Sequence, residues 1–145
     1  MPAPRGYAPT KQSTILRAVR TLRFDVQPFR KLIVWQNAHA LALNLYKTTR
    51  TFPSDERYGL TSQIRRSAAS ICANIAEGCG RQTRRDFARF AYIALGSASE
   101  LEYHLLMAAD LGILNEECYL PLERSVTQVK RMLSGLIRKL MTDNR

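Results

Sequence analysis

One stretch of this 145-residue chain, residues 59–81, constrains the fold most because it carries two different stripes on one predicted helix. Apolar residues recur there at steps of three and four, the spacing of a helix face that packs against a core. They are Leu60, Ile64, Ala68, Ile71 and Ile75. A second line has the same step and is short, polar and mostly uncharged: Gln63, Ser67, Ser70, Asn74, Glu77 and, past the helix, Arg81. A solvent-facing stripe normally carries Lys and Glu, so this one predicts contact with something outside the helix's own core.

The same periodicity predicts four helices along the chain. We expect them at about residues 30–51, from Ser54 to the glycines at 78 and 80, from Thr83 to Gly112, and from Asn115 to about residue 140. Ser54, Thr83 and Asn115 are residue types that cap helix N-termini, and acidic residues come shortly after each of them. The apolar seam expected for the last helix is Leu122, Val126, Val129, Leu133, Leu136 and Leu140. Pro121 predicts either a kink in that helix or a start nearer Leu120.

The predicted fold class is all-α. No stretch shows the alternation of a strand, and short connections between long helices favour an antiparallel up-down-up-down four-helix bundle over residues 29–145. Residues 1–28 are rich in Pro and Arg and differ in composition from the rest of the chain, so we expect a flexible basic extension that is disordered or loosely helical. One interpretation makes it an arm that lies on an anionic surface. The other makes it a loose tail or the product of an upstream start codon.

Charge is the strongest compositional feature. The net charge is +10, and 17 of the 22 basic residues are Arg, whose guanidinium fork suits phosphate and carboxylate groups. This balance favours contact with polyanions, although an Arg-rich composition with a solvated surface would look the same. The functional interpretation places a nucleic-acid-binding ridge around the connection between the second and third helices: Arg65, Arg66, Arg81, Arg84, Arg85 and Arg89.

A purely structural role for the same polar residues is the alternative. Arg65 or Arg66 would then pair with Glu100 or Glu102 on the next helix, and Glu77 would pair with Arg81 at the helix end. We also assign Glu100 to the predicted polar contact stripe.

The sequence shows no pattern that catalysis needs, so we expect a protein that is not an enzyme and has no cofactor. Glu100 and Glu102 lie two residues apart, which turns their side chains to different sides of a helix. Three cysteines without a CxxC pair predict neither a disulfide framework nor a zinc site, and favour a reducing cytoplasm. A site of Cys79, Cys118, His39 and His104 remains a minor alternative. No run is apolar enough to span a bilayer, and no signal peptide is expected.

Several motifs also carry a family resemblance. They are Val34-Trp35-Gln36-x-Ala38, Phe52-Pro53-x-x-Glu56-x-Tyr58-Gly59-Leu60, Gln63-Ile64-Arg65-Arg66, Ala73-Asn74-Ile75-Ala76-Glu77-Gly78 and Gly96-Ser97-x-x-Glu100-Leu101-Glu102. From about Phe29 to Leu140 the chain resembles the four-helix-bundle proteins encoded in 23S rRNA intervening sequences. More remotely, it is similar to the accessory bundle of diversity-generating retroelements, in which a basic pentameric ring holds RNA and a reverse transcriptase.

The resemblance implies a bacterial, cytoplasmic protein that forms a ring-shaped homopentamer. The family usually has proline where this chain has Cys72, and residues 1–28 have no counterpart in it.

We consider two hypotheses for the function. The first is an oligomeric bundle that binds RNA backbone through its Arg-rich surface without reading sequence. The second is an adaptor that docks another protein, for example a reverse transcriptase, and whose charge is incidental.

Overall fold

The computed structural model describes residues 28–142, and in this range the chain is helical without any strand. The prediction of an all-α fold with four helices is therefore confirmed for these residues, whereas the predicted basic extension lies outside them except for Pro28. The elements are the short turns η1 (Phe29–Lys31), η2 (Thr49–Thr51) and η3 (Ser54–Glu56) and the helices α2 (Ile33–Thr48), α3 (Leu60–Cys79), α4 (Arg84–Asp110) and α5 (Glu116–Thr142).

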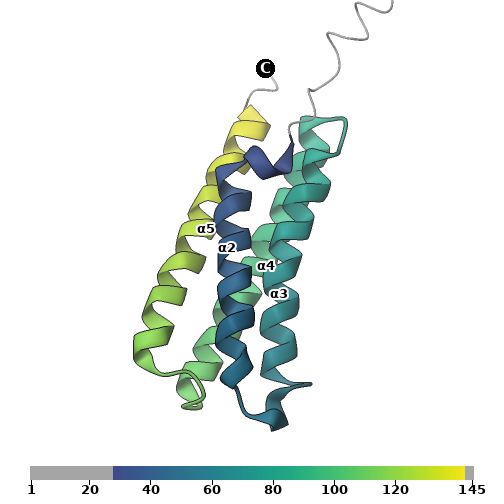
Figure 1. Cartoon of the computed structure of the whole chain (residues 1–145). Coiled ribbons are helices and arrows are strands. Elements are labelled where there is room, and N and C mark those ends of the chain that lie inside the picture. Colours follow the sequence, from purple (N-terminus) through teal and green to yellow (C-terminus); the bar gives the residue numbers. More distant parts are fainter. Residues whose placement is uncertain (1–27, 143–145) are drawn as a thin grey trace, which may run out of the picture.

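The four helices lie side by side around one core (Figure 1). Helix α3 packs against α2 and α4, and α5 packs against α4 and α2, so that each helix has two main neighbours. The α2–α3 and α4–α5 connections lie at one end of the bundle in Figure 1. The α3–α4 connection, the start of α2 and the end of α5 lie at the other end. No helix in the described range is long and apolar enough to cross a bilayer.

The core is built from the seams that the sequence predicts. All five apolar residues of the predicted stripe on α3 are buried, from Leu60 to Ile75. On α5 the seam differs in one position, because Ile137 is buried and Leu136 is only partly so. The predicted seam kept a strict seven-residue repeat, but a straight helix has 3.6 residues per turn and its buried face drifts along such a repeat.

Two predicted helix starts are confirmed by their caps and one is wrong. The Asp86 N–H donates to Thr83 Oγ1 at 3.1 Å, and the Cys118 N–H donates to Asn115 Oδ1 at 2.9 Å. The second predicted helix does not begin at Ser54: residues 54–56 form the separate turn η3, and α3 begins at Leu60. The side chain of Glu56, four residues before the start of α3, accepts a hydrogen bond from the Leu60 N–H through Oε2 at 3.0 Å and so caps this helix.

The first and last helices also differ from their predicted bounds. The expected helix over residues 30–51 is divided into η1, α2 and η2. Helix α5 begins at Glu116 and contains Pro121, so the alternative start near Leu120 is wrong. Proline lacks an N–H and costs one bond of the helical ladder there. Helix α3 runs from Leu60 to Cys79 through Cys72, the position at which the resembled family usually has proline.

Gly78 marks the closest approach of α3 to α4. It is buried, and a Cβ atom added to it would lie 2.6 Å from Phe87 Cδ2 and 3.0 Å from the Phe90 Cβ. Both rings belong to buried residues, so they cannot move aside without disturbing the core. The absence of a side chain at Gly78 therefore lets the end of α3 press against the first turns of α4.

We predict that Gly78→Ala lowers the free energy of unfolding by about 1–3 kcal/mol, the usual cost of overpacking a core. Gly135→Ala in α5 is the matched control, because nothing lies within 4 Å of a Cβ built there. It should raise stability by up to about 1 kcal/mol through helix propensity. Urea denaturation followed by circular dichroism measures both. Equal effects of the two substitutions would contradict the close contact.

Candidate nucleic-acid interface

The six predicted nucleic-acid-binding arginines do not form one ridge. Arg65 and Arg66 lie near the start of α3, whereas Arg81, Arg84, Arg85 and Arg89 surround the α3–α4 connection at the other end of the bundle. From Arg66 to the end of α3 the helix rises by about 20 Å. The prediction of a single ridge is therefore wrong, and each group has its own surroundings.

Arg65 serves the fold. Its Nε donates to Thr49 Oγ1 at 2.9 Å and its Nη2 to the Tyr46 carbonyl oxygen at 3.2 Å, and the guanidinium lies 4.8 Å from the centre of the Tyr46 ring. These contacts join α3 to the end of α2. The expected pairing of Arg65 or Arg66 with a carboxylate of the next helix is wrong.

The two carboxylates of that expectation have other partners. Glu102 Oε2 accepts from Lys130 Nζ of α5 at 2.9 Å, and Glu100 Oε1 lies 3.3 Å from His104 Nε2. Arg65 points to the α2 side of α3, and sequence spacing alone does not tell which neighbouring helix lies there.

At the α3–α4 connection, two arginines share one aspartate. Arg81 Nη2 contacts Glu77 Oε1 at 2.8 Å, as predicted, and Arg81 Nε lies 3.8 Å from Asp86 Oδ2. Arg89 Nη2 lies 3.0 Å from Asp86 Oδ1. Both guanidinium groups also lie within 5 Å of the centre of the Phe90 ring, at 4.6 Å and 4.7 Å. Much of the positive charge of Arg81 and Arg89 is therefore balanced locally.

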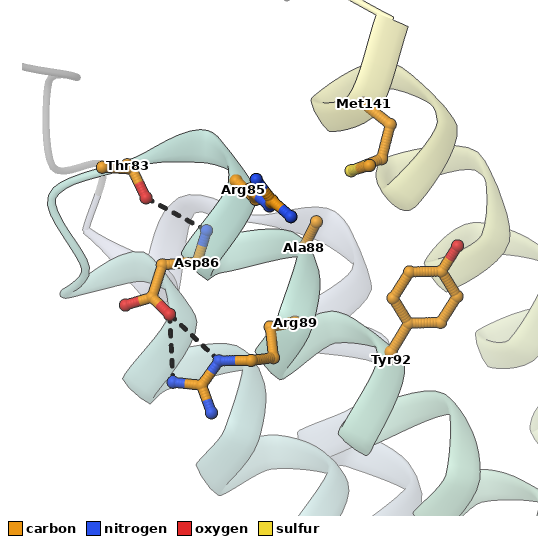
Figure 2. Close-up of a pocket in the computed structure, with 7 residues that line it drawn as sticks. All are labelled: Thr83, Arg85, Asp86, Ala88, Arg89, Tyr92 and Met141. Carbon is orange, nitrogen blue, oxygen red and sulfur yellow. Dashed lines mark hydrogen bonds and ion pairs between the residues drawn. The ribbon is translucent and has the colours of Figure 1, made fainter.

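Arg85 differs from these two. It is exposed, and the ion pairs and hydrogen bonds found over residues 28–142 do not involve it. In Figure 2 it stands on the first turn of α4, apart from the Asp86–Arg89 pair. Its guanidinium donors are therefore available to a ligand.

A stripe of three arginines on α5 was missed by the sequence analysis. Arg124, Arg131 and Arg138 recur every seven residues and are exposed, and their guanidinium groups have no ion pair or hydrogen bond within the described range. Seven residues are close to two turns, so all three share one face of the helix. We call them the α5 arginine stripe. The seven-residue spacing is visible in the sequence, and it runs on the face opposite the apolar seam.

Helix polarity does not account for this stripe. Acidic residues stand early in α5, at Glu116, Glu117 and Glu123, and residues 124–142 contain five basic residues and no acid. Cations are favoured near a helix C-terminus, but that effect fades beyond the last turn. Arg124 and Arg131 lie too far from the end to gain from it.

Two hollows succeed one another along the seam between α4 and α5. The first has a volume of about 680 Å³ and is lined by Leu95, Ser99, Glu102, Thr127, Lys130, Arg131, Ser134 and Arg138. The second, of about 480 Å³, lies nearer the start of α4 and is lined by Thr83, Arg85, Asp86, Ala88, Arg89, Tyr92 and Met141 (Figure 2). One helical turn of α4 separates them, and we call the pair the α4/α5 groove.

The predicted polar contact stripe lies only partly at the surface. Ser67 is 2% exposed, and its Oγ donates to the Gln63 and Ile64 carbonyl oxygens of its own helix. The expectation that Ser67 faces outward is therefore wrong. Gln63, Ser70, Asn74, Glu77 and Glu100 remain wholly or partly exposed.

Ser70 and Ser97 join α3 to α4 through a 2.9 Å contact between their hydroxyl oxygens, and Asn74 Nδ2 donates to Ser70 Oγ at 3.1 Å. Uncharged residues flank this pair. We define the α3/α4 face as Ser70, Ala73, Asn74, Ile93, Gly96 and Ser97. Ile93 is 44% exposed, and a Cβ built on Gly96 meets nothing within 4 Å. Nothing in the protomer therefore requires glycine at this position in the middle of a helix.

The cysteines and histidines do not gather into a metal centre within residues 28–142, where no three potential ligands among His, Cys, Asp and Glu lie together. All three cysteines are free thiols. Burial raises the pKa of Cys72 and of Cys79 from the ordinary 9.0 to about 11, whereas Cys118 is exposed. Neither raised thiol is an activated nucleophile at neutral pH.

We predict that a disulfide reagent at pH 8 modifies Cys118 first and Cys72 and Cys79 much more slowly, because a thiol with a pKa of about 11 is only about one part in a thousand thiolate at that pH. Cys118→Ser should remove the fast phase, and denatured protein should react rapidly at all three sites. A fast phase that survives Cys118→Ser would contradict the burial of the other two.

The same two thiols give stability a pH dependence. Their pKa values are higher in the folded chain than the ordinary 9.0, so unfolding releases protons between pH 9 and about 11. The stability that the two protonated thiols contribute to the fold is complete below pH 9, and it is lost as the pH rises towards 11.

Residues 28–142 thus form a four-helix structure in which arginines of α4 and α5 line a groove. Residues 30–135 match the family described as 23S rRNA-intervening sequence protein, and this chain belongs to that family. The resemblance inferred from the sequence motifs is thereby confirmed.

A solved structure of the same type comes from Bacteroides thetaiotaomicron, a protein with unknown function from the S23 ribosomal protein family. It is 30% identical in sequence, the match covers 73% of this chain and 99% of that one, and the TM-score is 0.66. No curated protein sequence matches this chain.

Proposed function

We propose that this protein is a non-enzymatic, self-associating helical bundle that holds the phosphate backbone of RNA in the bacterial cytoplasm without reading its sequence. The observation that carries the proposal is that eight exposed arginines have no carboxylate partner in the described range: Arg30, Arg50, Arg57, Arg66, Arg85, Arg124, Arg131 and Arg138. A guanidinium without a partner keeps its donors for phosphate oxygens, to which it binds in a fork.

Net charge adds to this local argument. A protomer of +10 attracts polyanions over distances beyond direct contact. The pentamer that the resemblance implies would carry about +50, which is five times the charge of one chain. Since the described range shows no recognition-helix turn or zinc site that would read base edges, contacts to the backbone are the form of binding that these residues support.

Self-association is supported by the α3/α4 face. Glycine at position 96 lowers the stability of α4, and no close contact inside the protomer requires it, because a Cβ atom built there meets nothing within 4 Å. The exposed Ile93 lies on the same face, one turn before it. A second helix that packs closely on this face would account for both. Gln63, Glu77 and Glu100 then form its polar rim.

We predict that the chain binds RNA oligonucleotides of different sequence with similar affinity and that binding weakens steeply as salt rises, because each neutralised phosphate releases counterions. Fluorescence anisotropy over about 50–200 mM salt measures the slope; Arg84→Glu with Arg85→Glu should flatten it. Because Arg84 is partly buried and Arg85 exposed, Arg85→Glu alone separates loss of binding from a folding defect. Affinity that is absent, or that does not change with salt, would remove the proposal.

We predict that the wild-type chain is an oligomer and that Ile93→Glu reduces it to a smaller species, because a charge in a closely packed interface is costly. Leu43→Glu on α2 is the matched control: Leu43 is exposed to 53%, similar to Ile93, and lies on a different helix. Light scattering coupled to size exclusion gives the mass of each. A wild-type chain that is monomeric at micromolar concentration would refute this part of the proposal.

The adaptor hypothesis uses neighbouring side chains. Tyr103 and Leu106 of α4 are large, exposed side chains that do not belong to the α3/α4 face. Exposed aromatic and apolar side chains of this kind are expected on a surface that docks a different protein. A partner retained after nuclease treatment, and lost with Tyr103→Glu but not with Leu43→Glu, would support the adaptor over the RNA-binding bundle.

A further inference from the structure

The α4/α5 groove is the place where free arginines from two helices meet a hollow surface. We propose that it is a track for the backbone of single-stranded RNA, formed by Arg131 and Arg138 of the α5 arginine stripe and continued by Arg85 and Arg89 of α4. Arg124 extends the track beyond the groove, in an adjoining hollow that Arg131 also lines. This inference rests on the proposed function and names the site and the form of RNA that it takes.

The spacing of the arginines points to a polymer. Arg124, Arg131 and Arg138 stand about 10 Å apart along the helix axis and span about 20 Å in total. A phosphate ion or a nucleotide needs donors that converge on one point, and these side chains start from points too far apart for that. A line of separate guanidinium groups matches a ligand whose negative charges repeat along its length.

The floor of the groove suits the same ligand. Ser99, Thr127 and Ser134 supply hydroxyl groups between the arginines, and hydroxyl groups are common partners of phosphate and sugar oxygens. The acid in this wall, Glu102, is paired with Lys130 at 2.9 Å and does not confront the ligand as a free charge. The first hollow therefore offers donors along its length, and the one acid that lines it is paired.

An aromatic ring at the other end distinguishes nucleic acid from other polyanions. Tyr92 is 57% exposed and lines the second hollow together with Arg85, Arg89 and Met141 (Figure 2). An exposed ring beside arginines is a platform on which an unpaired base stacks, and this contact is open to single strands rather than to duplexes. Arg89 also lines this hollow, and its guanidinium group pairs with Asp86.

The test compares two triple variants that remove the same charge. The first is Arg124→Gln, Arg131→Gln and Arg138→Gln in the stripe; the second is Lys47→Gln, Arg50→Gln and Arg57→Gln, exposed residues around η2 and η3. Gln and Arg have similar helix propensities, so the stripe variant should fold, and circular dichroism checks it. The probe is a fluorescent oligouridylate of about 20 nucleotides, added to the full-length protein, with affinity measured over a salt series.

We expect the stripe variant to bind at least about tenfold more weakly than the control variant at the same salt concentration. The slope of log affinity against log salt should fall by about two, since each lost contact to a single strand removes about 0.7. Equal losses in the two triple variants would overturn the track and leave the proposed function intact, because binding would then depend on net charge alone. A wild-type chain that does not bind the probe would instead refute the proposed function itself.

A second variant separates RNA from other polyanions. Tyr92→Leu keeps an apolar side chain but removes the stacking surface, so oligouridylate should bind about tenfold more weakly while inorganic polyphosphate of similar charge binds as before. If Tyr92→Leu leaves oligouridylate affinity unchanged and polyphosphate competes equally well, the assignment to RNA is overturned in favour of a general polyanion site. Binding to anionic vesicles that depends on the stripe while oligouridylate binding does not would overturn it as well.

Discussion

The close contact between α3 and α4 is the constraint on which the rest of the structure depends. Helix α4 presents mostly alanines to the core, among them Ala91, Ala94 and Ala98, and these small residues let the larger Ile64, Ile71 and Ile75 of α3 fill the space between the helices. Gly78 lets the end of α3 reach Phe87. Because α4 is held this tightly on one side, its position relative to α5 is also set, and with it the shape of the α4/α5 groove. The surfaces on either side of α4 are thus consequences of one packing arrangement.

Charge by itself does not locate a binding surface in this protein. Arg65 supports the joint between α2 and α3, and Arg81 and Arg89 share Asp86, so a good part of the Arg-rich composition serves the fold or is balanced locally. What distinguishes Arg131 and Arg138 is that residues 124–142 of α5 contain no acid and that both arginines line the α4/α5 groove. A paired guanidinium must give up its partner before it can bind phosphate, whereas an unpaired one only exchanges water. The arginines that we propose to bind phosphate are therefore identified by their surroundings rather than by composition.

The sequence predicts those features of the fold that depend on the spacing of residues along a single helix. The buried stripe of α3 and the caps at Thr83 and Asn115 depend on local spacing, and both are confirmed. The positions of Ser67 and Arg65 depend on which neighbour lies on which side of α3, and no local pattern contains that information. The Ser67 hydroxyl group donates a hydrogen bond to its own helix and therefore tolerates burial. For this reason the polar stripe predicted from the sequence includes a residue that is not at the surface.

The α5 arginine stripe is the opposite case. Its seven-residue spacing is visible in the sequence, but only the structure shows that the three guanidinium groups lack partners and that Arg131 and Arg138 line a groove. The two proposed surfaces are compatible with each other. The α3/α4 face includes Ile93 and Gly96 and contains no charged residue, whereas the free arginines Arg131 and Arg138 of the groove lie on α5. Copies of a strongly basic chain repel one another, so they can approach only through a face from which the arginines are absent. Association through that face would leave the groove of each copy open, and several grooves in one assembly would hold a single RNA strand more firmly than any one of them, because each further contact is made within the same complex.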